Sequence, residues 1–368
     1  MRLIFDAHLD LAWNAASFDR DLTLPLTTMR ECESSMSDAP HRGRATVTFP
    51  EMRRGGVGVC IATLLARSGP DHRRQPKYAR GDLDYATRIA CYASAHAQLA
   101  CYRFWEAAGE IVWIRTREDL HRHWNQISTR SFDADQPIGM ILSMEGADPI
   151  SSPEALQEWW DVGLRAIGPA HYGRSRYAAG TSTQGPLTQD GRRLLQAMRQ
   201  LGMALDVTHL SDDSMREALD LFDGPIWASH HACRSLVAGD RQLTDEQILT
   251  LAQRDAVIGV PFDAWMLTPQ WKSSGFDRSL VGVEKAIDQV DHICQLTGST
   301  RCLGIGSDLD GGFGTEQTPH DLNSIADLQR FADLLNQRGY ADQDVDAICH
   351  GNWLRHLAAS LPSETLQP

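Results

Sequence analysis

Short apolar segments alternate with helical patterns along almost the whole chain. Eight segments are rich in β-branched and aliphatic residues, and each is followed by a polar or glycine-containing break. They cover residues 3–7, 57–65, 138–144, 164–170, 204–208, 225–229, 256–260 and 302–306. Segments that are apolar from end to end are typical of strands buried on both faces of a parallel sheet.

Helical patterns separate several of these predicted strands. Apolar residues recur at three- and four-residue spacing in residues 84–108, 187–201, 211–221, 244–253 and 283–296. Thr188 and Ser211 stand where helix N-caps are expected. Alternating strands and helices predict an α/β fold, a single (β/α)8 TIM-type barrel with loop insertions. The alternative is an open doubly wound sheet, whose nucleotide-binding form carries GxGxxG after the first strand, where this chain has AHLD.

The length of 368 residues fits either two domains or one barrel of about 250 residues with additions. Residues 19–54, rich in Asp, Glu, Arg and Pro, are interpreted as a long insertion after the first strand. Residues 172–184 are expected to form a mobile loop, and residues 361–368 a frayed tail. Because none of these segments is long enough to form a domain, we predict one domain over residues 1–368.

Charge and cysteine spacing exclude several classes of protein. The chain has 35 Lys and Arg against 48 Asp and Glu, a net charge of −13, which argues against binding nucleic acid or an anionic membrane. It has no apolar run of about 18 residues, and Asp6 and Asp10 interrupt the apolar start that a signal peptide needs. We therefore expect a cytoplasmic protein. None of the eight cysteines forms a CxxC pair, so we expect reduced thiols rather than a disulfide scaffold or a zinc ribbon.

Several predicted strands end in a side chain that can bind a metal ion. These residues are His8, Asp10, Glu145, His171, His209, His230 and Asp308. In a barrel, the carboxyl ends of the strands share one rim, where active sites form. Imidazoles and carboxylates that meet there are the ligands expected for zinc or a similar divalent ion.

The spacing of His8 and Asp10 lets both side chains point to one side of a strand, onto one ion. Glu145 could bridge that ion to a second ion held by His209 and His230, with a water between the two. In that arrangement Asp308 would be the base, and His171 a donor to the oxyanion. A single histidine at a strand end is more often structural, so the hypothesis rests on the joint occurrence. His231, Asp206 and Asp310 alternate away from the centre and are interpreted as non-ligands.

The ordered set DAHLD, MEGADP, DVTHLS, ASHHACRSL and GIGSDLDGG resembles the renal (membrane) dipeptidase family, the M19 branch of the amidohydrolase-like metal-dependent barrels. The resemblance extends from Phe5 to the GNWLR segment at residues 351–355. It implies two zinc ions per subunit and a homodimer. His8 and Asp10 would bind one zinc, His209 and His230 the other, and Glu145 would bridge them.

The same resemblance implies roles for residues that do not bind metal. Asp308 would act on the bridging water and the leaving amine, and His171 would contact the substrate carbonyl or its tetrahedral intermediate. Arg241 would grip the substrate's terminal carboxylate, and Arg234 is a nearby alternative for this role.

The chain also departs from the family pattern. Asp148 stands where the family often has His, and residues 261–265, including Asp263, stand where animal members carry a Tyr near the substrate. Arg174 and Arg176 add positive charge after His171 and, together with Arg241, hint at an acidic or carboxylate-rich substrate. These departures leave the metal site intact and put the substrate's side chains in question.

These observations predict a zinc-dependent dipeptidase. It would hydrolyse L-Xaa-L-Xaa or L-Xaa-D-Xaa dipeptides by attack of a metal-bridging hydroxide. One alternative is another amidohydrolase-type metal hydrolase, acting on an N-acyl amino acid, a lactam or a phosphoester. A second alternative is a non-catalytic binding protein on the same barrel.

Overall fold

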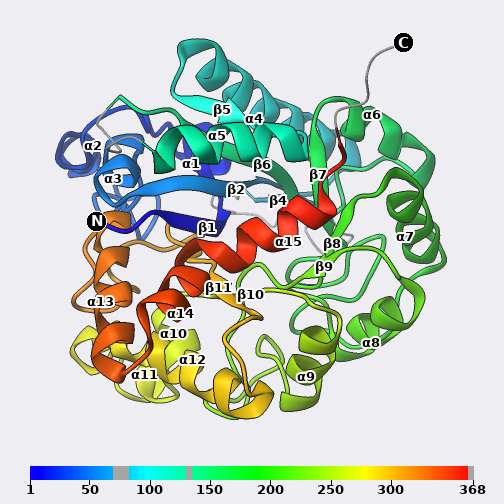
Figure 1. Cartoon of the computed structure of the whole chain (residues 1–368). Helices are drawn as coiled ribbons and strands as arrows, with labels where there is room; N and C mark the ends of the chain where they lie inside the picture. The colour runs from blue at the N-terminus through cyan, green and yellow to red at the C-terminus, as the bar shows by residue number, and fades with distance from the viewer. Residues whose placement is uncertain (69–82, 130–134, 364–368) are drawn as a thin grey trace.

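The computed structural model describes residues 1–68, 83–129 and 135–363. Eight parallel strands form a nearly closed barrel with flanking helices, which confirms the predicted fold class (Figure 1). The strands are β1 (Ile4–Leu9), β2 (Val57–Leu65), β6 (Ile138–Glu145), β7 (Leu164–Gly168), β8 (Ala204–Asp206), β9 (Ile226–Trp227), β10 (Ile258–Val260) and β11 (Leu303–Ile305). Their order is β10-β11-β1-β2-β6-β7-β8-β9, and Ala228, just after β9, forms a parallel bridge with Ile258 of β10.

Three further strands lie outside this ring. β5 (Ile111–Trp113) pairs with the first residues of β6, before β7 pairs with β6 from Leu142 onward. β3 (Arg67–Ser68) and β4 (Asp84–Tyr85) form a separate two-stranded sheet. None of the three was predicted, because two or three residues are too few to show a periodicity.

Helices cover the outside of the barrel. Those between β2 and β11 are α4 (Arg88–Ala108), α5 (Arg117–Ser128), α6 (Leu156–Asp161), α7 (Gln189–Leu201), α8 (Asp212–Leu221), α9 (Asp245–Gln253), α10 (Ala264–Leu267), α11 (Gln270–Ser273) and α12 (Glu284–Thr297). All five predicted helices are present, and Thr188 and Ser211 cap α7 and α8 as expected. The helix predicted from residue 84 begins at Arg88, because Asp84 and Tyr85 pair with β3.

The inserted segment after β1 is folded onto the barrel rim. It follows α1 (Leu11–Phe18) and contains α2 (Leu26–Glu33) and α3 (Phe49–Arg54). The buried Arg20 pairs with Glu33, with 2.8 Å between Nε and Oε1. Asp310 accepts hydrogen bonds from the backbone N–H of Thr46 (2.8 Å) and Val47 (3.0 Å), so it anchors this segment to the loop after β11.

Residues 172–184 are packed against the barrel and not free as expected for a mobile loop. Tyr172 bridges Thr181, and Arg174 bridges Ala179, so the segment folds back on itself. Tyr177 is fully buried, and its hydroxyl donates to the carbonyl of Ile150 at 2.7 Å. Two buried alanines that follow Tyr177 leave the segment little room to move.

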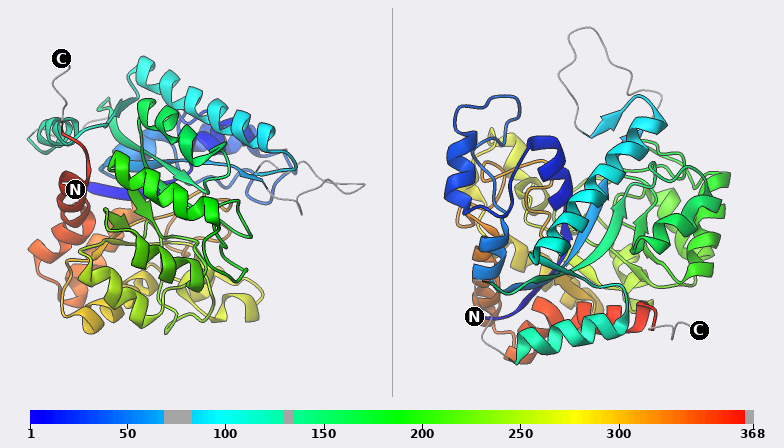
Figure 2. Two further views of the ribbon diagram at one scale, coloured as in Figure 1. Left: turned by 90° about the vertical axis from the view of Figure 1, so that its right-hand side faces the viewer. Right: turned by 90° about the horizontal axis from the view of Figure 1, so that it is seen from above.

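The last helix lies across one end of the barrel. The C-terminal elements are α13 (Leu328–Arg338), α14 (Asp342–Asp346), a π-helical turn (Ala347–Gly351) and α15 (Asn352–Ser360), and α15 crosses in front of the strands in Figure 1 and lies at one end in both views of Figure 2. The Trp353 indole N–H donates to the carbonyl of Ile305 at 3.0 Å, and its ring stacks on Phe5. A Cβ on Gly304 would lie 2.1 Å from that indole, so this position needs glycine. Of the predicted frayed tail, Leu361 is buried, and residues 364–368 lie outside the described residues.

Candidate metal centre

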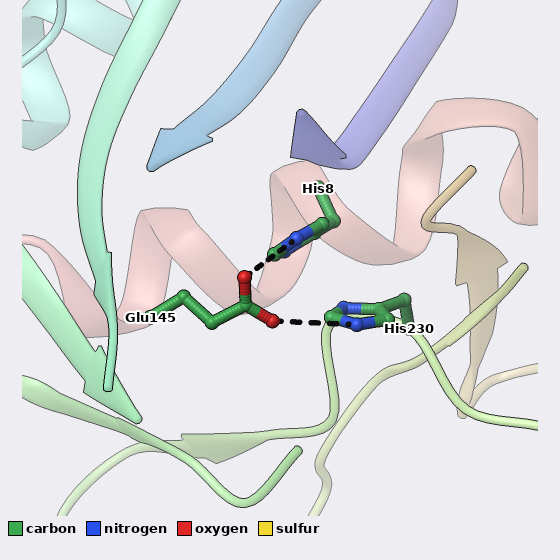
Figure 3. Close-up of side chains that lie close together, drawn as sticks. All are labelled: His8, Glu145 and His230. Carbon is green, nitrogen blue, oxygen red and sulfur yellow. Dashed lines mark ion pairs between the residues drawn. The ribbon is translucent and has the colours of Figure 1, made fainter. Parts of the chain in front are cut away.

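Glu145, the last residue of β6, lies between three histidines: His8 in β1, His209 in the loop after β8 and His230 in the loop after β9. Its Oε2 is 3.4 Å from Nε2 of His8. Its Oε1 is 3.3 Å from Nε2 of His209 and 3.5 Å from Nε2 of His230. Figure 3 shows one carboxylate oxygen directed at His8 and the other at His230. The two oxygens therefore face different histidines, which is the arrangement that a bridging carboxylate needs.

The remaining predicted residues surround this cluster. Nε2 of His8 is 3.7 Å from Oδ2 of Asp10 and 3.8 Å from Oδ1 of Asp308. Nε2 of His171 is 3.8 Å from Oε1 of Glu145. Among the described residues, three groups bring potential ligand atoms within 4.8 Å of one another: His8–Glu145–His230, Glu145–His171–His209 and His8–Asp10–Asp308. The structure thus brings together all seven strand-end residues.

Two buried atoms show that the cluster is suited to a cation. Nε2 of His8 and Oε1 of Glu145 are buried and have no hydrogen-bond partner within the protein. A buried polar atom without a partner costs about 1–3 kcal/mol. A divalent ion bound at each of these atoms would remove that cost, and nitrogen and oxygen donors fit zinc and related ions.

Two of the predicted ligand positions are set by turns rather than by strand alternation. His8 lies within β1, but β8 ends at Asp206, and His209 follows with φ 67°. Asp308 has φ 59°. A left-handed backbone is uncommon for residues other than glycine and often marks functional sites. The rule that strand ends share one rim therefore located His209 and Asp308. A left-handed backbone, and not the alternation of side chains along a strand, directs these two side chains.

Three of the histidines have a hydroxyl group at Nδ1. Ser229 Oγ lies 3.0 Å from Nδ1 of His230 and 3.5 Å from Nδ1 of His8. Thr181 Oγ1 lies 3.1 Å from Nδ1 of His209. A hydroxyl oxygen can accept a hydrogen bond from Nδ1–H, which leaves the Nε2 lone pair for a metal ion. Sequence reasoning missed these hydroxyl partners, because serine and threonine beside histidine carry no distinct signal.

His171 has a different partner. Its Nδ1 lies 3.0 Å from Nη1 of Arg67. Sequence reasoning missed Arg67, although a signal was present: Arg67 is the first polar residue after β2, so it follows the same strand-end pattern as the predicted residues.

Burial and local charge set the protonation of these groups. Burial lowers the pKa of His171, His209 and His230 well below its usual range, and for His171 the charge of Arg67 adds to the effect. Burial raises the pKa of Asp308, and the charges of Glu145 and Asp10 raise it further. The three imidazoles are therefore neutral, and a cation beside Asp308 would favour the ionised form of its carboxyl group.

Arg241 lies where the metal centre opens into a larger cavity. A small cavity of about 100 Å³ is lined by Arg241 and by the metal-centre residues other than His8. Arg241 also lines an adjoining cavity of about 580 Å³. Its guanidinium donates to the carbonyl of His230 at 3.0 Å, and Nη1 lies 3.3 Å from Nδ1 of His231. Two of its five N–H groups are used in these contacts, so others remain for a ligand.

Arg234, the alternative for the same role, is engaged elsewhere. Its Nη1 and Nη2 each lie 2.8 Å from one oxygen of Asp212, and its Nε donates to the carbonyl of Gln242. It lines neither cavity. Of the two arginines, only Arg241 therefore reaches the cavity at the metal centre.

The extra arginines do not add positive charge to the site. Arg176 pairs with Asp190, with 2.7 Å between Nη2 and Oδ2, and Arg174 donates to the carbonyl of Gln184. Neither arginine lines the two cavities, whereas Arg241 lines both, so of the three arginines behind the expected acidic substrate only Arg241 reaches the site. Asp148 is also structural, since its carboxylate accepts hydrogen bonds from the backbone N–H of Ser68 and Arg176.

Asp263 is the departure that does reach the site. It lines the small cavity, and the Gln317 amide donates to both of its oxygens at 3.0 and 3.1 Å. Burial raises the pKa of Asp263 to about 7. This carboxyl group is therefore part of the cavity at the metal centre.

The residues interpreted as non-ligands have other contacts. Asp206 accepts hydrogen bonds from the backbone N–H of Thr208 (3.0 Å) and Ser229 (3.1 Å), and so ties β8 to the loop after β9. The eight cysteines are free thiols, and none belongs to the ligand groups found among the described residues. In the same part of the chain, no helix has the length and apolar character needed to span a membrane.

Comparison with known proteins places this arrangement in a family. The family model for membrane dipeptidases, peptidase family M19, matches residues 2–363. An uncharacterized dipeptidase of Schizosaccharomyces pombe is 27% identical over 59% of this chain and 52% of its own length. Dipeptidase tcpJ of Claviceps purpurea is 26% identical over 60% of this chain and 51% of its own length. The chain thus spans about half the length of these two relatives.

Solved structures show the same fold. A metallo peptidase from Rhodobacter sphaeroides, liganded with a phosphinate mimic of the dipeptide L-Ala-D-Ala, aligns with a TM-score of 0.77 and 22% identity, over 98% of this chain and 99% of that chain. The probable dipeptidase PvdM from Pseudomonas aeruginosa aligns with a TM-score of 0.73 and 18% identity, over 98% of this chain and 95% of that chain. The barrel fold and the cluster of residues at its rim agree with the family-model match over residues 2–363. The chain belongs to the membrane dipeptidase family, peptidase family M19.

Proposed function

We propose that this protein is a zinc-dependent dipeptidase with two metal ions per subunit. One observation carries the proposal: Glu145 directs one oxygen at His8 and the other at His209 and His230, beside the buried Arg241. Family membership supports metal-dependent peptide hydrolysis. Zinc is proposed because imidazole and carboxylate ligands suit it.

The protein's own residues would divide the chemistry among them. Two zinc ions held by His8, Asp10, Glu145, His209 and His230 would supply the Lewis acidity that activates water and polarises the scissile carbonyl. Asp308, which faces both His8 and His230, would accept a proton from the attacking water and pass it to the leaving amine. His171 would donate a hydrogen bond to the developing oxyanion.

Arg241 would select substrates that end close to the metal centre. Its guanidinium would bind the terminal carboxylate, so the scissile bond could lie only one residue away from that end. A longer peptide would place its carboxylate too far from the metal ions. This geometry supports a dipeptidase rather than an endopeptidase.

The larger cavity beyond Arg241 would hold the side chain of the C-terminal residue. Aromatic rings of Tyr172, Trp265, Trp271 and Phe276 line it, so it would accept bulky apolar side chains. The ligand of the Rhodobacter relative mimics L-Ala-D-Ala, which makes a D residue at this position a further candidate.

A dipeptide screen tests the proposal. We expect the zinc-loaded protein to release free amino acids from L,L- or L,D-dipeptides and to leave the C-terminal amides of the same dipeptides largely intact. Hydrolysis of N-acyl amino acids or phosphoesters, with no dipeptide cleaved, would favour the alternative of a different metal hydrolase. Zinc binding with no hydrolysis of any of these substrates would favour a binding protein.

The oligomeric state and the cellular location stay predictions. The homodimer rests on the resemblance alone, and the cytoplasmic location rests on the polar residues near the start of the sequence. Sedimentation of the purified protein would test the first, and fractionation of the source cells would test the second.

A further inference from the structure

The contact between Arg67 and His171 fixes more than the position of the imidazole ring. Arg67, in β3, lies opposite Asp84 in β4, and its Nε and Nη2 contact the two oxygens of Asp84 at 2.7 and 2.8 Å. The third guanidinium nitrogen, Nη1, lies 3.0 Å from Nδ1 of His171. Asp84 therefore holds the guanidinium with one edge directed at His171.

A guanidinium can donate hydrogen bonds but cannot accept them. Nδ1 of His171 must therefore be the acceptor, and in the neutral ring the proton then lies on Nε2. Nε2 is the atom of His171 that faces Oε1 of Glu145, at 3.8 Å. His171 thus presents an N–H group to the metal centre.

The neighbouring histidine has the opposite arrangement. Nδ1 of His209 contacts the hydroxyl of Thr181, which can accept a hydrogen bond and leave the Nε2 lone pair free. His171 and His209 lie side by side, with 4.1 Å between ring centroids, and both face Glu145. The identity of the Nδ1 partner therefore separates a metal ligand from a hydrogen-bond donor.

We propose that Arg67, held by Asp84, is a positioning residue that fixes His171 as the Nε2–H tautomer, so that His171 donates to the substrate and does not bind a metal ion. Arg67 acts through His171 and contacts no reacting atom. The role toward a substrate rests on the proposed dipeptidase function, whereas the tautomer of His171 does not depend on it.

Nitrogen NMR of histidine-labelled protein tests the tautomer. We expect long-range ¹H–¹⁵N spectra of both the metal-free and the zinc-loaded protein to show an unprotonated Nδ1 and a protonated Nε2 for His171, with the signals assigned by their loss in His171→Gln. In Arg67→Met we expect this preference to disappear, and in Arg67→Lys we expect it to persist in part, because an ammonium group also donates. A protonated Nδ1 in the parent protein would overturn the proposal, whatever the variants do.

Steady-state kinetics test the consequence. Because the donor acts on the transition state, Arg67→Met should lower kcat by about 10- to 1000-fold with KM changed by less than about threefold. Arg67→Lys should retain a higher kcat than Arg67→Met. The kcat of Asp84→Asn should lie between that of the parent and that of Arg67→Met. Arg234→Met is the matched control, since Arg234 also pairs with an aspartate but has no hydrogen bond to a histidine of the metal centre, and its kcat should be close to that of the parent.

The two measurements separate failure of this inference from failure of the proposed function. If the parent hydrolyses dipeptides but Arg67→Met keeps both the tautomer and kcat, the positioning role is wrong. If the parent hydrolyses no dipeptide and His171 still shows the Nε2–H tautomer that Arg67→Met loses, the proposed function is wrong and the role of Arg67 stands.

Discussion

Replacing Arg241 tests how the protein recognises the end of its substrate. The guanidinium is buried, with only 3% of Arg241 exposed, and lies between the metal centre and the larger cavity. A hydrogen bond to a charged group contributes about 1.5–3 kcal/mol, and truncating one partner of a buried charge pair costs about 2–5 kcal/mol. At a factor of ten for each 1.4 kcal/mol, Arg241→Ala should lower kcat/KM for a free dipeptide by about 30- to 3000-fold.

The assay compares L-Ala-L-Ala with its C-terminal amide. In the parent, kcat/KM for the free acid should exceed kcat/KM for the amide by a similar factor. Arg241→Ala should lose this preference, because the substitution lowers kcat/KM for the free acid and changes that for the amide little. Arg234→Ala is the matched control and should keep the preference. Equal hydrolysis of both substrates by the parent would contradict recognition of the terminal carboxylate by Arg241. This role is also refuted if Arg241→Ala loses both activities to the same extent, since Arg241 would then serve only to support His230 through its carbonyl.

Further predictions address the metal centre, the substrate cavity and the stability of the fold. Glu145→Gln should reduce bound zinc from two ions per chain to one or none, as measured by mass spectrometry of the gently desalted protein, whereas retention of two ions would argue against bridging. Trp265→Ala should lower kcat/KM about tenfold for a dipeptide ending in Phe and leave one ending in Ala nearly unchanged; equal losses would exclude the larger cavity as the side-chain site. Burial lowers the pKa of His356 from 6.5 to about 4, so the unfolded chain binds a proton before the folded one does. The contribution of His356 to the free energy of unfolding is fully present above pH 6.5, and about 3 kcal/mol of it is lost as the pH falls toward 4. Urea unfolding should therefore show a shallower loss of stability over this range in His356→Gln, and parallel pH profiles would contradict the assignment.

The strands of the barrel could be predicted because each apolar segment is buried on both faces. The segment 57–65 became β2 with the same bounds, and all nine of its residues are buried. β5 could not be predicted, because its three residues have an alternating burial pattern too short to distinguish from a loop. The packing of residues 172–184 against the barrel also could not be predicted from the sequence. It depends on a hydrogen bond from the hydroxyl of Tyr177, in a polar segment, to the carbonyl of Ile150.

The metal-centre residues could be predicted because strand ends share one rim, whatever the local backbone does. Their partners could not, because they depend on which side chains meet across the rim. Thr181, for example, lies 28 positions from His209 in the sequence and reaches it only through the folded loop. The same holds for Arg174 and Arg176, because their proximity to His171 in the sequence does not bring either side chain into the lining of the two cavities.

Zinc titration of the metal-free protein tests whether dipeptide hydrolysis depends on two bound zinc ions. Hydrolysis of L-Ala-L-Ala and L-Ala-D-Ala would be followed as zinc is added to chain that has been stripped by a chelator, with bound metal measured in parallel. The proposed function predicts no activity without metal, and activity that rises to a plateau at two bound zinc ions per chain. Full activity in the stripped protein, or two tightly bound zinc ions with neither dipeptide cleaved, would contradict it.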